Sequence, residues 1–120
     1  MKQGIILFAH GSRDPLWRGP IESVAARIKA RSPNSLVGCA YLELSEPDLL
    51  TFATQLIAEG ADQLCILPMF LGVGKHARED LPVLLEALRL AHPAVPVEVK
   101  ISVGEDARLL DLMADIALGA

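Results

Sequence analysis

The stretch GIILFAHGSRDP at residues 4–15 passes from a continuous apolar run into small, polar and ionisable residues. A short apolar run without alternation is typical of a strand covered on both faces, as in a parallel sheet flanked by helices. His10 then stands at the carboxyl end of the predicted strand, the edge where open α/β sheets bind ligands. Gly11 and Ser12 permit a tight turn, and Pro15 prevents the strand from continuing. We therefore expect a buried strand that leads directly into a site.

The rest of the chain alternates apolar strand candidates with amphipathic helix patterns. Three further strands are predicted at residues 36–42, 63–70 and 95–103. The predicted helices run from about Trp17 to Arg31, from Ser45 as N-cap to Gly60 at the C′ position, from Asp80 as N-cap to His92, and through Leu109, Leu112, Met113 and Ile116. The order βαβαβαβα predicts a single α/β domain over residues 1–120, with a four-stranded parallel sheet between helices on both faces. In the flavodoxin-like strand order 2-1-3-4, His10, Glu43 and His76 meet on one rim.

Composition limits the classes of protein to which the chain can belong. The 120 residues are 52% hydrophobic but only 4% aromatic, so many aliphatic side chains must be hidden, some of them in a subunit interface. Apolar runs fall short of the about 18 to 20 residues that span a bilayer, and no signal-peptide pattern is present, so we expect a cytoplasmic protein. A net charge of −4 without basic runs argues against nucleic-acid binding. Cys39 and Cys65 lie in apolar segments without metal-ligand spacing, which predicts buried free thiols.

Three ionisable residues that follow predicted strands can carry chemistry. His10 and His76 can bind a divalent metal ion or accept protons, because neutral imidazole does both near neutral pH. The alternative is a pair of turn histidines that bond to backbone groups. Glu43 can draw in a metal ion or take up a proton, but a glutamate after a strand can equally be an ordinary loop residue.

Charged residues and glycines surround the two histidines. Arg13, Lys75 and Arg78 would suit a substrate with several carboxylates, with solvated loop charges as the alternative. Gly72 and Gly74 can form a lid hinge, a close backbone approach to a ligand or an ordinary turn. Histidine phosphatases are excluded because Ala9 stands where their arginine precedes the histidine, and no glycine-rich nucleotide motif follows the first strand.

Three motifs taken together resemble a known family. FAHGSRDP at residues 8–15, AYLELSEP at 40–47, and LPMFLGVGKH at 67–76 continuing to DLP at 80–82 resemble the class II tetrapyrrole chelatases of the sirohydrochlorin cobaltochelatase/ferrochelatase (CbiX/SirB) type. The resemblance implies a chelatase fold and a lyase that inserts divalent cobalt, iron or nickel into sirohydrochlorin for cobalamin or sirohaem biosynthesis. It places His10 and His76 on the family's metal-binding and catalytic histidines, and Glu43 on its acidic residue.

The same resemblance carries expectations about substrate, cofactor and partners. The metal ion is then a substrate rather than a tightly bound cofactor, and the many carboxylates of sirohydrochlorin need binding groups. We expect these groups to be Ser12, Arg13, Gly72, Gly74, Lys75 and Arg78. The chain has one lobe where many members have two, which implies a short form working as a homodimer, without nucleic-acid or membrane partners. A metal or tetrapyrrole carrier without turnover, and an interaction domain without a small-molecule site, remain as alternatives.

Overall fold

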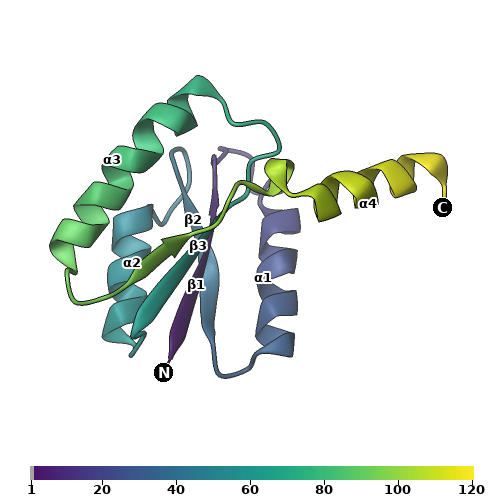
Figure 1. The fold of residues 1–120 in the computed structure, drawn as a ribbon. Coiled ribbons are helices and arrows are strands. Elements are labelled where there is room, and N and C mark those ends of the chain that lie inside the picture. The colour runs from purple at the N-terminus through teal and green to yellow at the C-terminus, as the bar shows by residue number, and fades with distance from the viewer. Residues whose placement is uncertain (1) are drawn as a thin grey trace.

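The computed structural model describes residues 2–120, and its strands and helices alternate along the chain (Figure 1). The elements are β1 (Gln3–Ala9), α1 (Gly19–Arg31), β2 (Leu36–Tyr41), α2 (Leu49–Ala58), β3 (Gln63–Pro68), α3 (Lys75–Ala91), β4 (Val97–Val99), the short 3-10 helix η1 (Val103–Glu105) and α4 (Ala107–Leu118). The predicted alternation is therefore confirmed.

The strands form one parallel sheet in the order β2-β1-β3-β4, as predicted. The central strand β1 pairs with β2 on one side and with β3 on the other, so that Leu7 lies between Cys39 and Leu67. Its residues from Ile6 to Ala9 are fully buried. Burial on both faces explains why this run is apolar without alternation.

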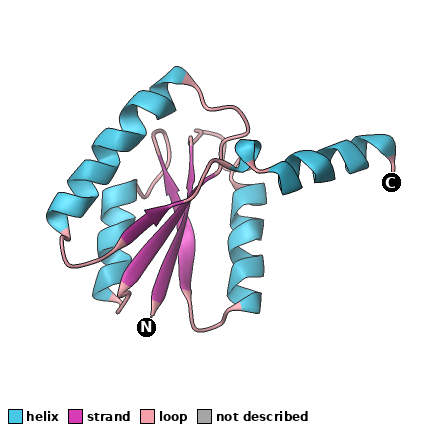
Figure 2. Ribbon diagram, viewed as in Figure 1, coloured by secondary structure: helices cyan, strands magenta, loops and turns pink. Residues whose placement is uncertain are grey.

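Helices cover the two faces of the sheet unequally (Figure 2). On one face, Ile6 and Phe8 pack in the main core beneath α2 and α3, where the rings of Phe8 and Phe70 meet edge to face at 6.0 Å. On the other face, Leu7 and Ala9 pack in a smaller core with Ile21 of α1. The three-layer α/β fold is thus confirmed. α4 forms as a helix but projects away from both cores (Figure 1).

Two predicted helix starts are wrong. α2 is capped by Asp48, whose carboxylate accepts a hydrogen bond from the Thr51 amide at 2.8 Å, and not by Ser45, because the Ser45 hydroxyl bonds to Ser12 instead. α3 begins at Lys75, one turn and more before Asp80. The earlier start buries Ala77 against the main core.

Other boundaries differ by a few residues. Pro82 lies inside α3, and Leu81, Leu84, Leu85 and Leu88 of this helix pack in or against the main core, with Leu88 fully buried. Gly60 follows Glu59, the C-cap residue of α2, with φ +111, as its predicted C′ position requires. β4 is only three residues long, because Pro96 before it lacks an amide donor and the chain turns into η1 soon after it. Among residues 2–120, no helix is both long and apolar enough to span a bilayer.

Candidate functional site

An imidazole and a carboxylate meet where β1 and β2 end. His10 directly follows β1, Glu43 lies two residues after β2, and His10 Nε2 is 2.7 Å from Glu43 Oε1. The two side chains are 46% and 43% exposed. The pair is therefore open to an ion or molecule arriving from solvent.

The sheet itself brings the two side chains together. Ala9 pairs with Tyr41 in the last register of β1 and β2. Beyond that register, the Leu42 amide donates to the Ala9 carbonyl at 2.9 Å, and the Glu43 amide donates to the His10 carbonyl at 3.0 Å. Hydrogen bonding of the two strands thus continues into the loops and sets His10 beside Glu43.

Gly11 allows the two loops to touch through their backbones. Its φ is +104, and a Cβ added there would lie 1.7 Å from the Glu43 carbonyl oxygen. Leu44, the residue after Glu43, also has a positive φ of 64, a conformation that a bulky residue rarely adopts. The close approach and the unusual backbone both occur next to the candidate site.

Ser45 links the same two loops through its side chain. Its hydroxyl accepts from the Ser12 amide at 3.1 Å and donates to the Ser12 carbonyl at 2.8 Å. Sequence reasoning missed this role, because a serine ahead of a helix pattern also reads as a cap. The available signal was its position two residues after Glu43, at a strand end that already carried a candidate site residue.

The loop after β3 lies on the same edge of the sheet, because β3 pairs with β1 in parallel and the Met69 amide donates to the Phe8 carbonyl at 2.7 Å. Lys75, His76 and Arg78 stand exposed in the first turn of α3 that follows this loop. One guanidinium nitrogen of Arg78 donates to the Val73 carbonyl at 2.9 Å. One hydrogen-bond donor of Arg78 thus stabilises the loop before α3.

The structure does not assemble the three candidate metal ligands into one cluster. Within residues 2–120, no three side chains of His, Cys, Asp or Glu come close enough together to hold one ion. His10 and Glu43 form a pair, and His76 stands apart in the first turn of α3. Gly72 and Gly74 would accommodate a Cβ without contact within 4 Å, so this conformation does not itself require glycine.

The remaining predicted residues lie close to the pair in sequence. Ser12 is half-buried, and its hydroxyl accepts from the Asp14 amide at 3.1 Å, whereas Arg13 is exposed. A neutral imidazole nitrogen and a carboxylate oxygen are both ligands for divalent first-row metals, and both can accept a proton. The pair can therefore hold an ion loosely and can also act as a base.

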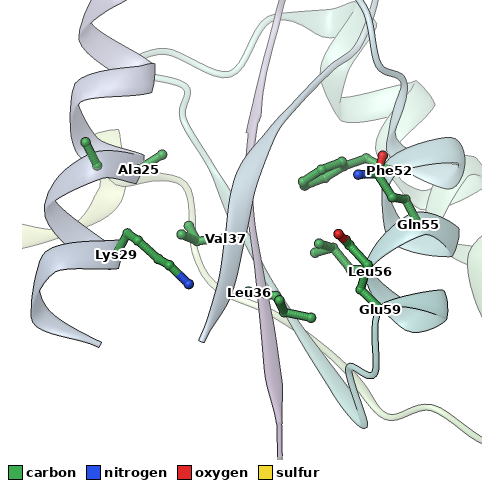
Figure 3. Close-up of a pocket in the computed structure, with 9 residues that line it drawn as sticks. Ala25, Lys29, Leu36, Val37, Phe52, Gln55, Leu56 and Glu59 are labelled. Carbon is green, nitrogen blue, oxygen red and sulfur yellow. The ribbon is translucent and has the colours of Figure 1, made fainter. Parts of the chain in front are cut away.

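Two of the cavities in the described chain are large enough to note, and both lie away from these residues. Figure 3 shows one of about 390 Å³ at the edge strand β2, between α1 and α2. Lys29 reaches toward it from α1, but its ammonium donates to the Pro33 and Ser35 carbonyls at 2.9 and 3.0 Å and so secures the turn after α1. None of the predicted site residues lines this cavity. The second is an apolar groove on the α1 face of the sheet.

Comparison with known proteins identifies the family. Residues 4–117 match the family model CbiX. The chain is similar to the sirohydrochlorin cobaltochelatase of Methanococcus aeolicus, with 34% identity over 83 residues, 69% of this chain and 58% of that protein. The chain thus spans less than two thirds of that relative's length.

Solved structures agree with the family model. A CbiX protein from Marinobacter aquaeolei, assigned to cobalamin (vitamin B12) biosynthesis, superimposes with a TM-score of 0.83 at 32% identity, over 98% of this chain and 93% of that chain. The sirohydrochlorin chelatase SirB from Bacillus subtilis subspecies spizizenii, in complex with cobalt, gives a TM-score of 0.77 at 26% identity, over 98% of this chain and 52% of that chain. The resemblance seen in the three sequence motifs is confirmed, and the chain belongs to the CbiX family.

Proposed function

We propose that this chain is a sirohydrochlorin chelatase, which inserts a divalent metal ion, first cobalt and second iron, into the macrocycle. The observation that carries the proposal is the half-exposed His10–Glu43 pair, 2.7 Å apart at the open edge of the sheet in a CbiX-family chain. Two of the similar proteins are a sirohydrochlorin cobaltochelatase and a sirohydrochlorin chelatase, which favours an enzyme over a carrier.

Two protein ligands suit an ion that must be passed on. First-row metal ions bind nitrogen and oxygen at about 2.1 Å, so two ligands at right angles on one ion stand about 3.0 Å apart. His10 Nε2 and Glu43 Oε1 would need to part by only a few tenths of an ångström to hold the ion in place of the proton between them. The other coordination positions stay open for water and then for the nitrogens of the macrocycle.

Insertion exchanges protons for the ion without transferring electrons between atoms. Two pyrrole N–H bonds break, their electron pairs remain on nitrogen and bind the ion, and two protons leave. When the ion moves onto the macrocycle, the imidazole of His10 and the carboxylate of Glu43 are free to accept those protons. In this proposal His76, in the first turn of α3, acts as a third ligand or base.

The substrate carboxylates would meet the cations on both loops. Arg13 extends from the loop after β1, and Lys75 and Arg78 extend from the first turn of α3, all exposed. Arg78 keeps further guanidinium donors beyond the one bonded to Val73. Ser12, Gly72 and Gly74 would contribute polar or backbone contacts in the same loops.

A homodimer completes the proposal. The match to SirB covers 98% of this chain but only 52% of the SirB chain. A second copy of this chain would therefore supply the second lobe. We place the active site in or beside this interface. The enzyme would act in the cytoplasm, in cobalamin or sirohaem biosynthesis, with the metal ion as substrate and no resident cofactor.

The direct test follows the visible spectrum of anaerobic sirohydrochlorin with cobalt or ferrous ion, because metal insertion shifts the absorption bands of the macrocycle. Wild type should accelerate the shift over many turnovers, and His10→Ala should lower kcat/KM by at least about 100-fold, in the range of general base removal. His92→Ala is the matched control: this imidazole bonds to Thr54 at the far end of α3, about 24 Å along the helix from His76.

Each alternative has its own signature in this assay. If wild type binds one equivalent of ion or macrocycle and accelerates nothing, the chain is a carrier. If wild type turns over and His10→Ala matches it, the assignment of the site is wrong. Comparison of the two ions by kcat/KM decides which metal is preferred.

A further inference from the structure

The last helix leaves most of its apolar face exposed in the described chain. α4 places Leu109, Leu112, Met113 and Ile116 three and four residues apart, and therefore on one face. Leu112 is 53% exposed, Ile116 is 69% exposed, and every residue from 110 to 120 is exposed. Figure 1 shows α4 running away from the sheet and the other helices. A twelve-residue helix is marginal in water alone, so its stability depends on covering this face.

The body of the protein has a groove of matching chemistry. It measures about 890 Å³ and lies on the sheet face where α1 packs alone, whereas α2 and α3 both cover the opposite face. The groove is lined mainly by aliphatic side chains, among them Ile5, Leu7, Ile28, Leu67, Val99 and Val103. An apolar surface of this size on a sheet is normally covered by another element.

The width of the uncovered strip suits one helix. The groove is lined by β1, β3 and β4, which are neighbours in the sheet. Its width is therefore two strand spacings, or about 10 Å. A helix with its side chains is about 10–12 Å in diameter, and twelve residues extend for about 18 Å. α4 therefore has the dimensions and the apolar face that the groove needs.

Backbone contacts direct the chain's own α4 away from this groove. The Gly104 amide of η1 donates to the Phe70 carbonyl at 3.0 Å, and a Cβ on Gly104 would lie 1.7 Å from the Leu71 carbonyl oxygen. Asp106 then starts α4 by accepting from the Arg108 amide at 2.9 Å. Leu109 and Leu112 of α4 are among the residues that line the groove, and the helix then runs away from the sheet.

We infer that α4 of one chain occupies the groove of a second copy, and that the exchange is reciprocal. Both complementary surfaces belong to this chain, so each copy gives one helix and receives one, and the pair closes around a two-fold axis. The inference rests on the homodimer proposed above and not on chelatase activity. η1 packs against the loop that leads to His76, so the exchanged helices would leave each body beside its candidate site.

The first experiment measures mass in solution by sedimentation equilibrium. Wild type should show twice the 12.9 kDa chain mass. The variant Leu112→Lys/Ile116→Lys should weaken self-association by at least about 100-fold, because two large aliphatic side chains can no longer be buried. The control variant Asp111→Lys/Asp115→Lys also introduces two lysines, but on the polar face of α4, and it should remain dimeric. Circular dichroism checks that each variant is folded.

The second experiment locates the helix by paramagnetic broadening of amide resonances. A spin label is placed at Ala117→Cys in an unlabelled chain with Cys39→Ala and Cys65→Ala, which is mixed with isotopically labelled wild type. Exchange predicts broadening of β1, β3 and β4 amides at the groove of the labelled chain. A wild-type monomer overturns both the exchange and the homodimer. A dimer in which only α4 amides broaden, or in which the label acts only within its own chain, overturns the exchange and leaves the homodimer standing.

Discussion

Replacing Gly11 by alanine tests whether backbone contact between two loops holds the His10–Glu43 pair. The new Cβ would stand 1.7 Å from the Glu43 carbonyl oxygen, where real Cβ atoms keep at least 3.0 Å. Alanine also pays about 1–2 kcal/mol for a positive φ, which is +104 here. Neither cost can be avoided by a side-chain rotation, because both partners are backbone.

The loop after β2 must therefore move. Retreat of the Glu43 carbonyl strains the bond from the Glu43 amide to the His10 carbonyl, now 3.0 Å and worth about 0.5–1.5 kcal/mol. Together the two effects lower the free energy of unfolding by about 1.5–3.5 kcal/mol, or about 6–14 °C in Tm for a chain of this size. A shift of about 1 Å between the imidazole and the carboxylate is expected to lower kcat/KM about 100-fold.

Urea unfolding and the spectral chelatase assay measure these two quantities on the same sample. Gly19→Ala is the matched control, because a Cβ at Gly19 meets nothing within 4 Å and the residue is helical. That variant should be neutral or slightly more stable, with unchanged kcat/KM. Wild-type stability and activity in Gly11→Ala would show that the loop contact does not hold the pair.

Two further predictions concern residues near the pair and in the sheet. Ser45→Ala removes both hydrogen bonds to Ser12, so it should lower the free energy of unfolding by about 1–2 kcal/mol and also lower kcat/KM; unchanged urea unfolding would contradict this. Burial raises the pKa of Tyr41, the single tyrosine, to about 12, so the folded state keeps its phenol proton at a pH where the unfolded chain loses it. The free energy of unfolding should therefore stay constant with respect to this group below about pH 10 and fall between about pH 10 and pH 12. If the tyrosinate absorbance of the folded protein has its midpoint near about pH 10, the raised pKa of Tyr41 is wrong.

The sheet could be predicted because its signal is local and strong. A fully apolar run such as Ile6 to Ala9 needs cover on both faces, and in a chain with alternating helices this requires a parallel sheet. Right-handed crossovers then leave few strand orders, and the observed one brings His10 and Glu43 to the same edge. The candidate pair therefore follows from topology.

The helix starts could not be predicted from local patterns, because tertiary contacts decide them. Ser45 and Asp48 are equally good caps in isolation, and only the loop after β1 determines that Ser45 bonds to Ser12. Asp80 followed by Pro82 is also a good start signal, yet burial of Ala77 extends α3 to Lys75. Periodicity likewise predicted α4 but could not say where its apolar face goes.

The number of ligands at the pair bears on the kind of metal chemistry that it can support. Catalytic sites that retain their ion typically hold it with three protein ligands. His10 and Glu43 provide two within one described chain, both about half exposed, and His76 lies separately in the first turn of α3. In the proposed function, this pair would hold an ion weakly enough to lose it to four macrocycle nitrogens, whereas a third ligand fixed beside the pair would slow that transfer; His76, which is not fixed beside the pair, would be able to bind the ion and release it. The His10–Glu43 pair therefore suits a metal ion that is a substrate better than a cluster of three fixed protein ligands would.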